Sequence, residues 1–274
     1  MRAQNLTISV PYKGCDKDCP YCVSKMTGYM DTDDDEQFYW NMVKARTVAK
    51  AAQVSSILIT GKGEPTLNKN ACERIGEVFS EFPIEMQTNG ISMLKNWTKN
   101  KTIFGSDYLS TVAFSIDSLA QWKELSDMMK FIRKYGMLVR ATLNLTDKFS
   151  EDFDFGYAIE LAKETNVHQL SFRNIVVPKG LTEGCIDVIK WITEHKCAEA
   201  YQRVIDQFSY LKDDARVLRT LPFGAVVYDF EGIAVTMFDE CVQSVNHNED
   251  IRSLIYQEDG HMYTSWDSPA SILF

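Results

Sequence analysis

Short apolar runs alternate with stretches of helical periodicity along the first two thirds of this chain. The runs that predict strands are residues 6–10, 56–60, 84–90, 111–116, 138–144 and 169–177. The stretches between them that predict helices are residues 32–49, 71–79, 120–134 and 151–163. Such alternation is typical of repeated βα units around a parallel sheet. Six repeats predict an α/β fold, a partial (β/α)6 TIM-like barrel that lacks the full eight repeats of a closed barrel.

The first of these helices has both a start signal and an apolar face. Four carboxylates at residues 33–36 favour a helix start there, because acidic groups interact well with the positive end of the helix dipole. The residues predicted to form its apolar face are Phe38, Met42, Val43, Val48 and Ala49.

The pattern changes near residue 178. A helical stretch comes next, and two apolar–polar alternations then predict β-hairpins that turn at Glu231-Gly232 and at Asp259-Gly260. An Asp-Gly pair favours a two-residue hairpin turn. We therefore expect a core over residues 1–178 and a C-terminal extension over residues 179–274, made of helices and two hairpins, that caps the barrel.

Composition narrows the class of protein. The 274 residues are 45% hydrophobic and 12% aromatic, which is typical of a well-packed globular protein. The net charge of −9 argues against a nucleic-acid surface, which normally carries a basic footprint. The N-terminus lacks a basic segment followed by a long apolar run, and nothing approaches the roughly 20 apolar residues of a membrane span. With reduced thiols, these features predict a cytoplasmic protein.

Three cysteines, Cys15, Cys19 and Cys22, lie within eight residues directly after the first predicted strand. Thiolates select zinc, copper(I) or iron–sulfur clusters. A structural zinc site needs a fourth ligand, usually from a second closely spaced pair. The other cysteines and histidines are isolated in the sequence: Cys72, Cys185, Cys197, Cys241, His168, His195, His247 and His261. Three ligands without a fourth indicate a [4Fe–4S] cluster with one open iron, and a partial zinc site is the alternative.

The motif Cys15-x-x-x-Cys19-x-x-Cys22, with Tyr21 before its last cysteine, resembles the signature loop of the radical S-adenosylmethionine (radical SAM) superfamily. Residues 61–67, GKGEPTL, resemble the glycine-rich motif that follows the second strand in that superfamily. Residues 87–90, QTNG, resemble its third-strand ending. The match covers roughly residues 6–178 in the expected order. One departure is Lys62, which stands where the family has its second glycine.

The resemblance implies two cofactors, a [4Fe–4S] cluster and S-adenosylmethionine (SAM). The three cysteines would hold three irons, and the fourth iron would take the amino and carboxylate groups of SAM. The backbone of residues 61–64 would meet the methionine ammonium, because Gly61 and Gly63 lack a Cβ and allow close approach. Glu64 would either accept a hydrogen bond from that ammonium or only brace the loop. Without the cysteines, the same segment would be an ordinary βα turn.

Polar residues at the later strand ends are further cofactor candidates. In the resemblance, Ser115 and Asp117 contact the ribose, although Asp117 or Ser118 could instead begin a helix. Arg140 lies in an apolar strand, where a charge needs a partner. That partner is the SAM carboxylate, or else a helix carboxylate if Arg140 points outward. The remaining candidates are Tyr21 and Lys62 within the two motifs, Asn144 near the ribose or the substrate, Gln87 and Asn89 at the cavity floor, and Arg173 for an anionic substrate group.

The activity that the resemblance implies is reductive cleavage of SAM to methionine and a 5′-deoxyadenosyl radical, which takes hydrogen from a substrate. We expect an oxygen-sensitive enzyme that acts on a small metabolite or nucleotide-like molecule and receives its electron from a flavodoxin or ferredoxin. One alternative is a peptide- or protein-modifying enzyme, including a glycyl-radical activase. The other is a non-catalytic iron–sulfur sensor.

Two observations bear on the substrate. Many peptide-modifying members carry cysteine-rich segments for auxiliary clusters, whereas Cys185, Cys197 and Cys241 lack close spacing and are expected to be structural thiols. The superfamily's deazapurine-forming enzymes are similar in size, but their metal-binding threonine after the third cysteine is Val23 here.

Overall fold

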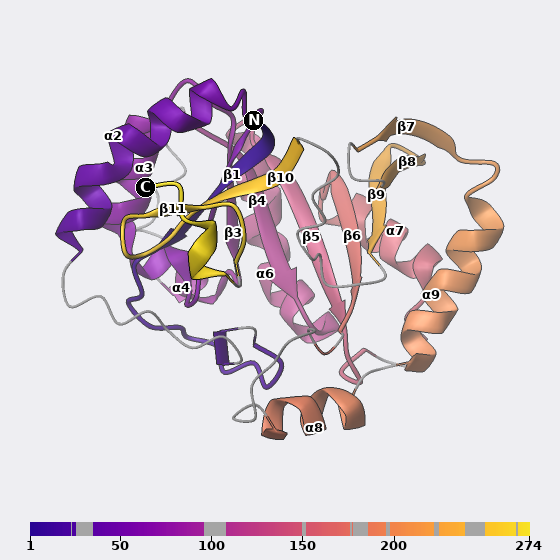
Figure 1. Ribbon diagram of the computed structural model, residues 1–274. Coiled ribbons are helices and arrows are strands. Elements are labelled where there is room, and N and C mark those ends of the chain that lie inside the picture. The colour runs from indigo at the N-terminus through magenta and orange to yellow at the C-terminus, as the bar shows by residue number, and fades with distance from the viewer. Residues whose placement is uncertain are drawn as a thin grey trace. The chain divides into compact units, whose positions relative to one another are not determined.

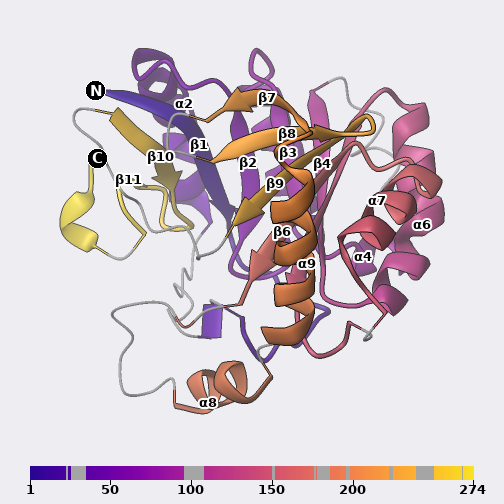
Figure 2. The ribbon, with the colours of Figure 1, turned by 90° about the vertical axis from the view of Figure 1, so that its right-hand side faces the viewer.

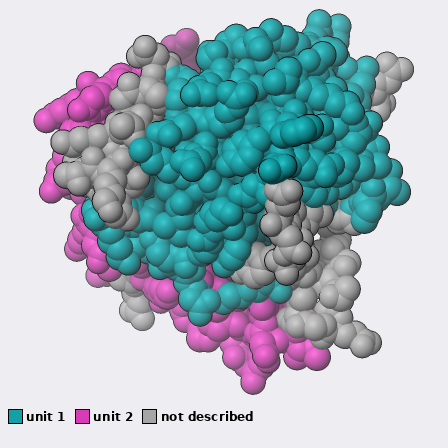
Figure 3. All heavy atoms as spheres, turned by 90° about the vertical axis from the view of Figure 1, so that its left-hand side faces the viewer, with its two compact units in different colours: residues 1–18, 23–112, 244–274 teal, residues 19–22, 113–243 magenta. Residues whose placement is uncertain are grey.

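The computed structural model describes most of the chain (Figure 1). The described residues are 1–22, 24–25, 35–95, 108–149, 152–175, 177, 186–195, 198–221, 225–238, 250–266 and 268–274. They form two compact units, the first made of residues 1–18, 23–112 and 244–274 and the second of residues 19–22 and 113–243 (Figure 3). Each unit combines residues from before and after position 178, so the division at that position stays a prediction.

The first unit contains a mostly parallel sheet with the strand order β11-β10-β1-β2-β3. Its strands are β1 (Arg2–Val10), β2 (Ile57–Gly61), β3 (Ile84–Thr88), β10 (Asp250–Tyr256) and β11 (Met262–Tyr263). Its helices are α2 (Glu36–Ala51), α3 (Lys69–Val78), α4 (Ile91–Lys95) and the 3₁₀ turns η1 (Pro65–Leu67) and η3 (Pro269–Ser271). Strands β1, β2 and β3 end at one edge of the sheet because they run parallel, which brings the predicted motif loops to that edge.

Helix α2 packs its apolar residues with a helical period. Its buried residues are Phe38, Met42, Ala45 and Ala49. The prediction that Val43 belongs to this face is wrong, because its side chain is 55% exposed. Successive residues in a helix are rotated by about 100°, so Val43 turns away from the direction of Met42.

The second unit has the strand order β5-β6-β9-β8-β7, with β4 running into it from the first unit. Its strands are β4 (Leu109–Ile116), β5 (Leu138–Leu145), β6 (Gln169–Asn174), β7 (Arg216–Thr220), β8 (Val226–Phe230) and β9 (Ile233–Phe238). Its helices are α6 (Leu119–Lys134), α7 (Phe155–Glu164), α8 (Ile186–His195) and α9 (Ala198–Leu211). Phe155 of α7 packs against the sheet and α9, since its ring contacts those of Phe172, Phe208 and Phe230. Figure 2 shows α9 in front of this part of the sheet.

Both predicted hairpins are confirmed. Strands β8 and β9 turn at Glu231 and Gly232, which both have positive φ as a tight hairpin turn requires. The β10–β11 connection is longer than the predicted two residues, spanning residues 257–261. Each hairpin also adds a parallel strand that the sequence did not indicate, because β9 pairs with β6 and β10 pairs with β1.

The fold class is confirmed at the level of a mixed α/β fold with a large parallel component and covering helices. Closure into a partial barrel, and capping of that barrel by the C-terminal hairpins, stay predictions. Strand β7 has no counterpart among the predicted elements. Among the described residues, no helix combines the length and the apolar character needed for a membrane span.

Candidate active site

The cysteine loop and the glycine-rich loop meet in the first unit. The Glu64 N–H donates to the Gly14 carbonyl oxygen at 3.0 Å. A Cβ on Gly63 would lie only 2.2 Å from that same oxygen and 2.7 Å from the Tyr12 ring. Gly63 is therefore required by the packing of the two loops against each other. Gly14 itself has a φ of +104°, in the left-handed region that favours glycine.

The Glu64 carboxylate is the centre of a buried hydrogen-bond network. Glu64 is buried, with 4% of its surface exposed. Oε1 accepts from the Thr66 N–H at 3.1 Å and from the Thr66 and Thr88 hydroxyls, each at 2.6 Å, while Oε2 accepts from the Asn89 N–H at 2.8 Å. Burial raises the pKa of Glu64, and these four hydrogen bonds oppose the rise. These contacts brace the loop, and acceptance of a hydrogen bond from the SAM ammonium stays a prediction.

Asn89 connects the third strand to the first cysteine. Its Nδ2 donates to Asp16 Oδ1 at 3.0 Å and lies 3.7 Å from Cys15 Sγ, within hydrogen-bond range for sulfur. Its Oδ1 accepts from the Ile91 N–H at 2.8 Å, as expected where a turn leads into a helix. Asn89 directly follows β3, as the sequence predicts, whereas a place at the cavity floor stays a prediction for Asn89 and Gln87. Gln87 lies two residues earlier on the strand and donates to Glu85.

Glu258 is a buried carboxylate that sequence reasoning missed. It lies in the β10–β11 connection, is 0% exposed, and its Oε1 accepts from the Ser9 hydroxyl at 3.2 Å. Burial raises the pKa of Glu258, and the charge of Lys62 and the N–H groups of Tyr12 and Lys62 act against that rise. Glu258 thus contacts the residues that follow both β1 and β2. An acidic residue beside a hairpin turn usually faces solvent, so the sequence carried no signal for this role.

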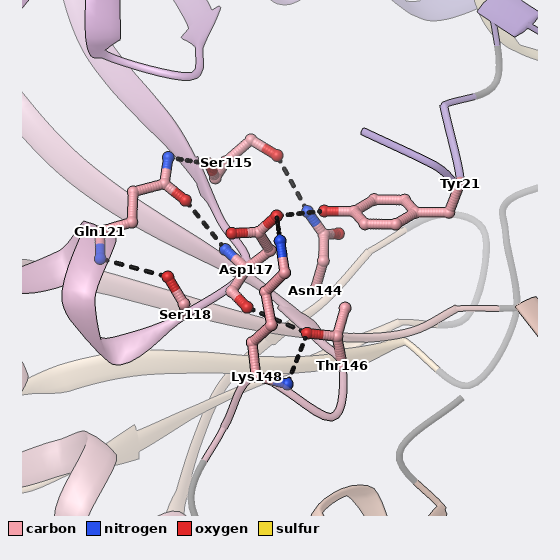
Figure 4. Close-up of polar contacts among 8 residues, drawn as sticks. All are labelled: Tyr21, Ser115, Asp117, Ser118, Gln121, Asn144, Thr146 and Lys148. Carbon is pink, nitrogen blue, oxygen red and sulfur yellow. Dashed lines mark hydrogen bonds and ion pairs between the residues drawn. The ribbon is translucent and has the colours of Figure 1, made fainter. Parts of the chain in front are cut away.

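Tyr21 and Asp117 form the centre of the polar network in the second unit (Figure 4). The Tyr21 hydroxyl donates to Asp117 Oδ2 at 3.2 Å, and Lys148 Nζ lies 3.6 Å from the same oxygen. Asp117 is 3% exposed. Burial, followed by the charge of Asp117, raises the pKa of Tyr21 well above its usual range. The Tyr21 ring also packs on Trp191 of α8, with ring centroids 5.6 Å apart, a contact that the sequence did not reveal.

The residues around Asp117 decide how α6 begins. Ser118 is the N-cap of α6 and accepts from the Gln121 N–H, so the capping alternative holds for Ser118. The Asp117 carboxylate is thereby left for Tyr21 and Lys148. Ser115, predicted beside Asp117, accepts at its hydroxyl from Asn144 Nδ2 at 2.9 Å (Figure 4). Three of the predicted ribose and substrate residues, Ser115, Asp117 and Asn144, are therefore close together.

Strands β5 and β6 carry a polar face. Paired residues in register are Arg140 with Gln169, Thr142 with Ser171, and Asn144 with Arg173. Because side chains alternate along a strand, these six lie on one face of the sheet. Arg140 Nε donates to Gln169 Oε1 at 2.8 Å, which supplies one partner for the charge inside this apolar strand. A contact of Arg140 with a SAM carboxylate stays a prediction.

The thiols of the described chain fall into two kinds. Cys15, Cys19 and Cys22 form no disulfide bond and reach the surface at least in part, and the Cys22 N–H donates to the Cys19 carbonyl. Cys72 is buried, which raises its pKa to about 12, so it stays a protonated thiol. The three accessible cysteine thiols are of the kind that ligates iron–sulfur clusters.

The cysteines expected to hold the cluster are divided between the two units. Cys15 belongs to the first unit and Cys19 and Cys22 to the second. Among the described residues, no three His, Cys, Asp or Glu side chains gather as metal ligands, so the ligand set stays a prediction. The residues singled out in the sequence analysis that lie outside the described ranges include Val23, Cys185, Cys197, Cys241 and His247.

The chain was compared with known protein families, sequences and structures. No family model matches the chain. A 7-carboxy-7-deazaguanine synthase from Clostridium acetobutylicum is 25% identical over 174 residues, which cover 61% of this chain and 73% of that protein. Structures of Streptococcus suis SuiB, alone and bound to S-adenosylmethionine, match 97% of this chain with TM-scores of 0.55 and 0.56. A third SuiB structure, bound to the precursor peptide SuiA, matches 96% with a TM-score of 0.56.

The SuiB comparison concerns the fold, since the sequences are 15% identical. The chain spans 60% of the SuiB chain. It therefore has the fold found in that part of SuiB, and the comparison does not determine its substrate.

Proposed function

We propose that this chain, which belongs to the radical SAM superfamily, is an enzyme that removes hydrogen from a small polar metabolite or nucleotide-like substrate. The proposed enzyme uses a [4Fe–4S] cluster and SAM, and the likeness to a SuiB structure bound to S-adenosylmethionine supports the second cofactor. In this proposal the parallel strands form the partial barrel expected from the sequence, the electron comes from a flavodoxin or ferredoxin, and the enzyme works in the cytoplasm.

The residues present fit these cofactors. Cys15, Cys19 and Cys22 would hold the cluster, because they are the accessible thiols within the described ranges, where Cys72 is buried. Residues 61–64 would hold the methionine end of SAM through their backbone. When bound, the reduced cluster and SAM supply a 5′-deoxyadenosyl radical that abstracts a hydrogen atom from the substrate.

The protein's own part is to hold these segments still. Glu64 ties the glycine-rich loop to the end of β3 through the Thr88 hydroxyl and the Asn89 N–H. In the second unit, Asp117 accepts a hydrogen bond from the hydroxyl of Tyr21, the residue directly before the third cysteine. Such pre-formed contacts place cofactor-binding backbone without reorganisation during turnover, which is how fixed polar groups contribute most to catalysis.

The main support for a polar, small-molecule substrate is the polar face of β5 and β6. Its residues offer guanidinium, amide and hydroxyl groups at three successive levels of the two strands. Arg173 is exposed on this face and suits an anionic substrate group. A substrate rich in hydrogen-bonding groups matches this face better than an apolar one. The similarity to a 7-carboxy-7-deazaguanine synthase supports the same class.

The test is label transfer under anaerobic conditions. Reconstituted protein is given dithionite, SAM and a size-fractionated extract of perdeuterated cells, and 5′-deoxyadenosine is analysed by mass spectrometry. We expect deuterium in 5′-deoxyadenosine with the low-mass fraction. If a fully loaded cluster yields no 5′-deoxyadenosine with any fraction, the enzyme proposal is wrong and the iron–sulfur sensor takes its place.

A peptide substrate is the second candidate, favoured by the likeness to SuiB bound to its precursor peptide. The same experiment separates the two. Deuterium transferred only from the high-mass fraction, and lost after protease treatment of that fraction, supports a peptide or protein substrate. Transfer that survives the protease supports the small molecule.

A further inference from the structure

We propose that Asn89 is a positioning residue that donates an N–H···S hydrogen bond to Cys15 and so raises the reduction potential of the cluster. The inference rests on the proposed function, since it concerns the cluster that Cys15 helps to hold. It gives Asn89, which the sequence predicts as a cofactor candidate at the cavity floor, a specific partner and a specific effect.

The geometry brings the amide to the sulfur. Asn89 Nδ2 lies 3.7 Å from Cys15 Sγ and 3.0 Å from Asp16 Oδ1. The amide nitrogen carries two hydrogens, one for each acceptor. Asn89 is 8% exposed, so water competes little for either hydrogen bond.

The orientation of the amide follows from its other end. Asn89 Oδ1 accepts from the Ile91 N–H at 2.8 Å. Exchanging the oxygen and nitrogen of the amide would set two donors against each other there, and would turn the amide oxygen toward the Asp16 carboxylate. Only one orientation therefore satisfies both ends, and it directs N–H groups at Cys15.

The backbone of Asn89 is held as firmly as its side chain. Its N–H donates to Glu64 Oε2 at 2.8 Å. Glu64 is itself buried and holds the glycine-rich loop, so the donor to Cys15 is fixed by the same carboxylate that braces that loop. Asn89 thus joins three segments of the first unit: the cysteine loop, the glycine-rich loop and the end of β3.

The consequence for the cluster is electrostatic. Reduction adds a negative charge that spreads onto the cysteine sulfurs, and an N–H donor to one of them stabilises the reduced state. Partners of metal ligands tune a site in this way without touching the metal. Removing the donor should make the cluster harder to reduce, at unchanged iron content.

The test compares midpoint potentials, measured by redox titration with electron paramagnetic resonance on reconstituted protein without SAM. Asn89→Asp keeps an oxygen for the Ile91 N–H but removes both N–H groups. At the wild-type midpoint its reduced-to-oxidised ratio should fall about tenfold, a shift of about 59 mV for one electron. Asn166→Asp is the matched control, since Asn166 Oδ1 accepts from Arg133 and an aspartate keeps that contact.

A second measurement needs no substitution at the site. Wild-type protein with ¹⁵N in its asparagine side chains should show a nitrogen coupling to the reduced cluster in pulsed resonance spectra, absent from Asn89→Asp. An unchanged midpoint, or no coupling in the wild type, overturns the inference while leaving the enzyme proposal intact. Failure of the wild-type protein to load a cluster at all overturns the proposed function instead.

Discussion

Replacing Glu64 by alanine tests the bracing network most directly. The substitution removes the acceptor of two buried backbone N–H groups, those of Thr66 and Asn89, and of two threonine hydroxyls. A buried donor left without a partner costs about 1–3 kcal/mol, so the two N–H groups alone imply about 2–6 kcal/mol. The loss should lie near the lower end, because burial of the carboxylate is itself unfavourable, as the raised pKa of Glu64 shows.

The assay is urea unfolding of the cluster-free protein, reduced and followed by circular dichroism. With a denaturant slope of about 2 kcal/mol per molar, a loss of about 3 kcal/mol lowers the midpoint by about 1.5 M. Glu64→Gln keeps one acceptor oxygen and should lose less, about 1–3 kcal/mol. Glu77→Ala removes an exposed carboxylate from the helix that follows, and should change stability by less than about 0.5 kcal/mol. A Glu64→Ala midpoint equal to that of Glu77→Ala would refute the bracing role.

Three further substitutions test other parts of the site. Cys19→Ala should abolish cluster loading, measured as bound iron after reconstitution, whereas Cys72→Ala should keep it; equal iron in both contradicts the ligand assignment. Gly63→Ala should destabilise the protein by roughly 2 kcal/mol or more, as overpacking of a core does, because its Cβ would overlap the backbone of the cysteine loop. Gly156→Ala is the control, since its Cβ would make only an ordinary contact and should be tolerated. Similar melting temperatures for the two variants would argue against the loop packing. Burial raises the folded-state pKa of Glu258 above its ordinary 4.5, so the free energy of unfolding should fall as the pH rises above that value. Glu258→Gln should reduce this slope in urea titrations at several pH values, leaving the part that buried Glu64 contributes; a slope equal to that of the wild type would contradict the role of Glu258.

Local sequence signals were sufficient for several parts of the molecule. The apolar runs located β1 to β6, because a buried strand needs consecutive apolar side chains wherever helices cover it. Gly136, two residues after the predicted helix 120–134, adopts the positive φ that a helix end favours. The Glu231-Gly232 turn was found for the same kind of reason. Each of these features depends on residues within a few positions of one another.

The buried face of α2 marks where such signals become insufficient. Val43 was assigned to this face because it is apolar, whereas the structure buries Ala45, whose spacing from the other buried residues of α2 matches the helical period. The same holds for Glu64, which the sequence left between two roles. Its partners come from β3, and a pattern within its own loop holds no information about them.

The sequence by itself determined the alternation of strands and helices, the three cysteines that follow β1, and the resemblance of their spacing to the signature loop of a known superfamily. Only the tertiary structure decided what the polar side chains do. Ser9 and Glu258 are 249 positions apart, yet share a hydrogen bond because β10 pairs in parallel with β1. Asn89 donates to Cys15 across 74 positions. Periodicity and motif spacing record short-range constraints, whereas the partner of a buried polar group is set by which strands lie side by side.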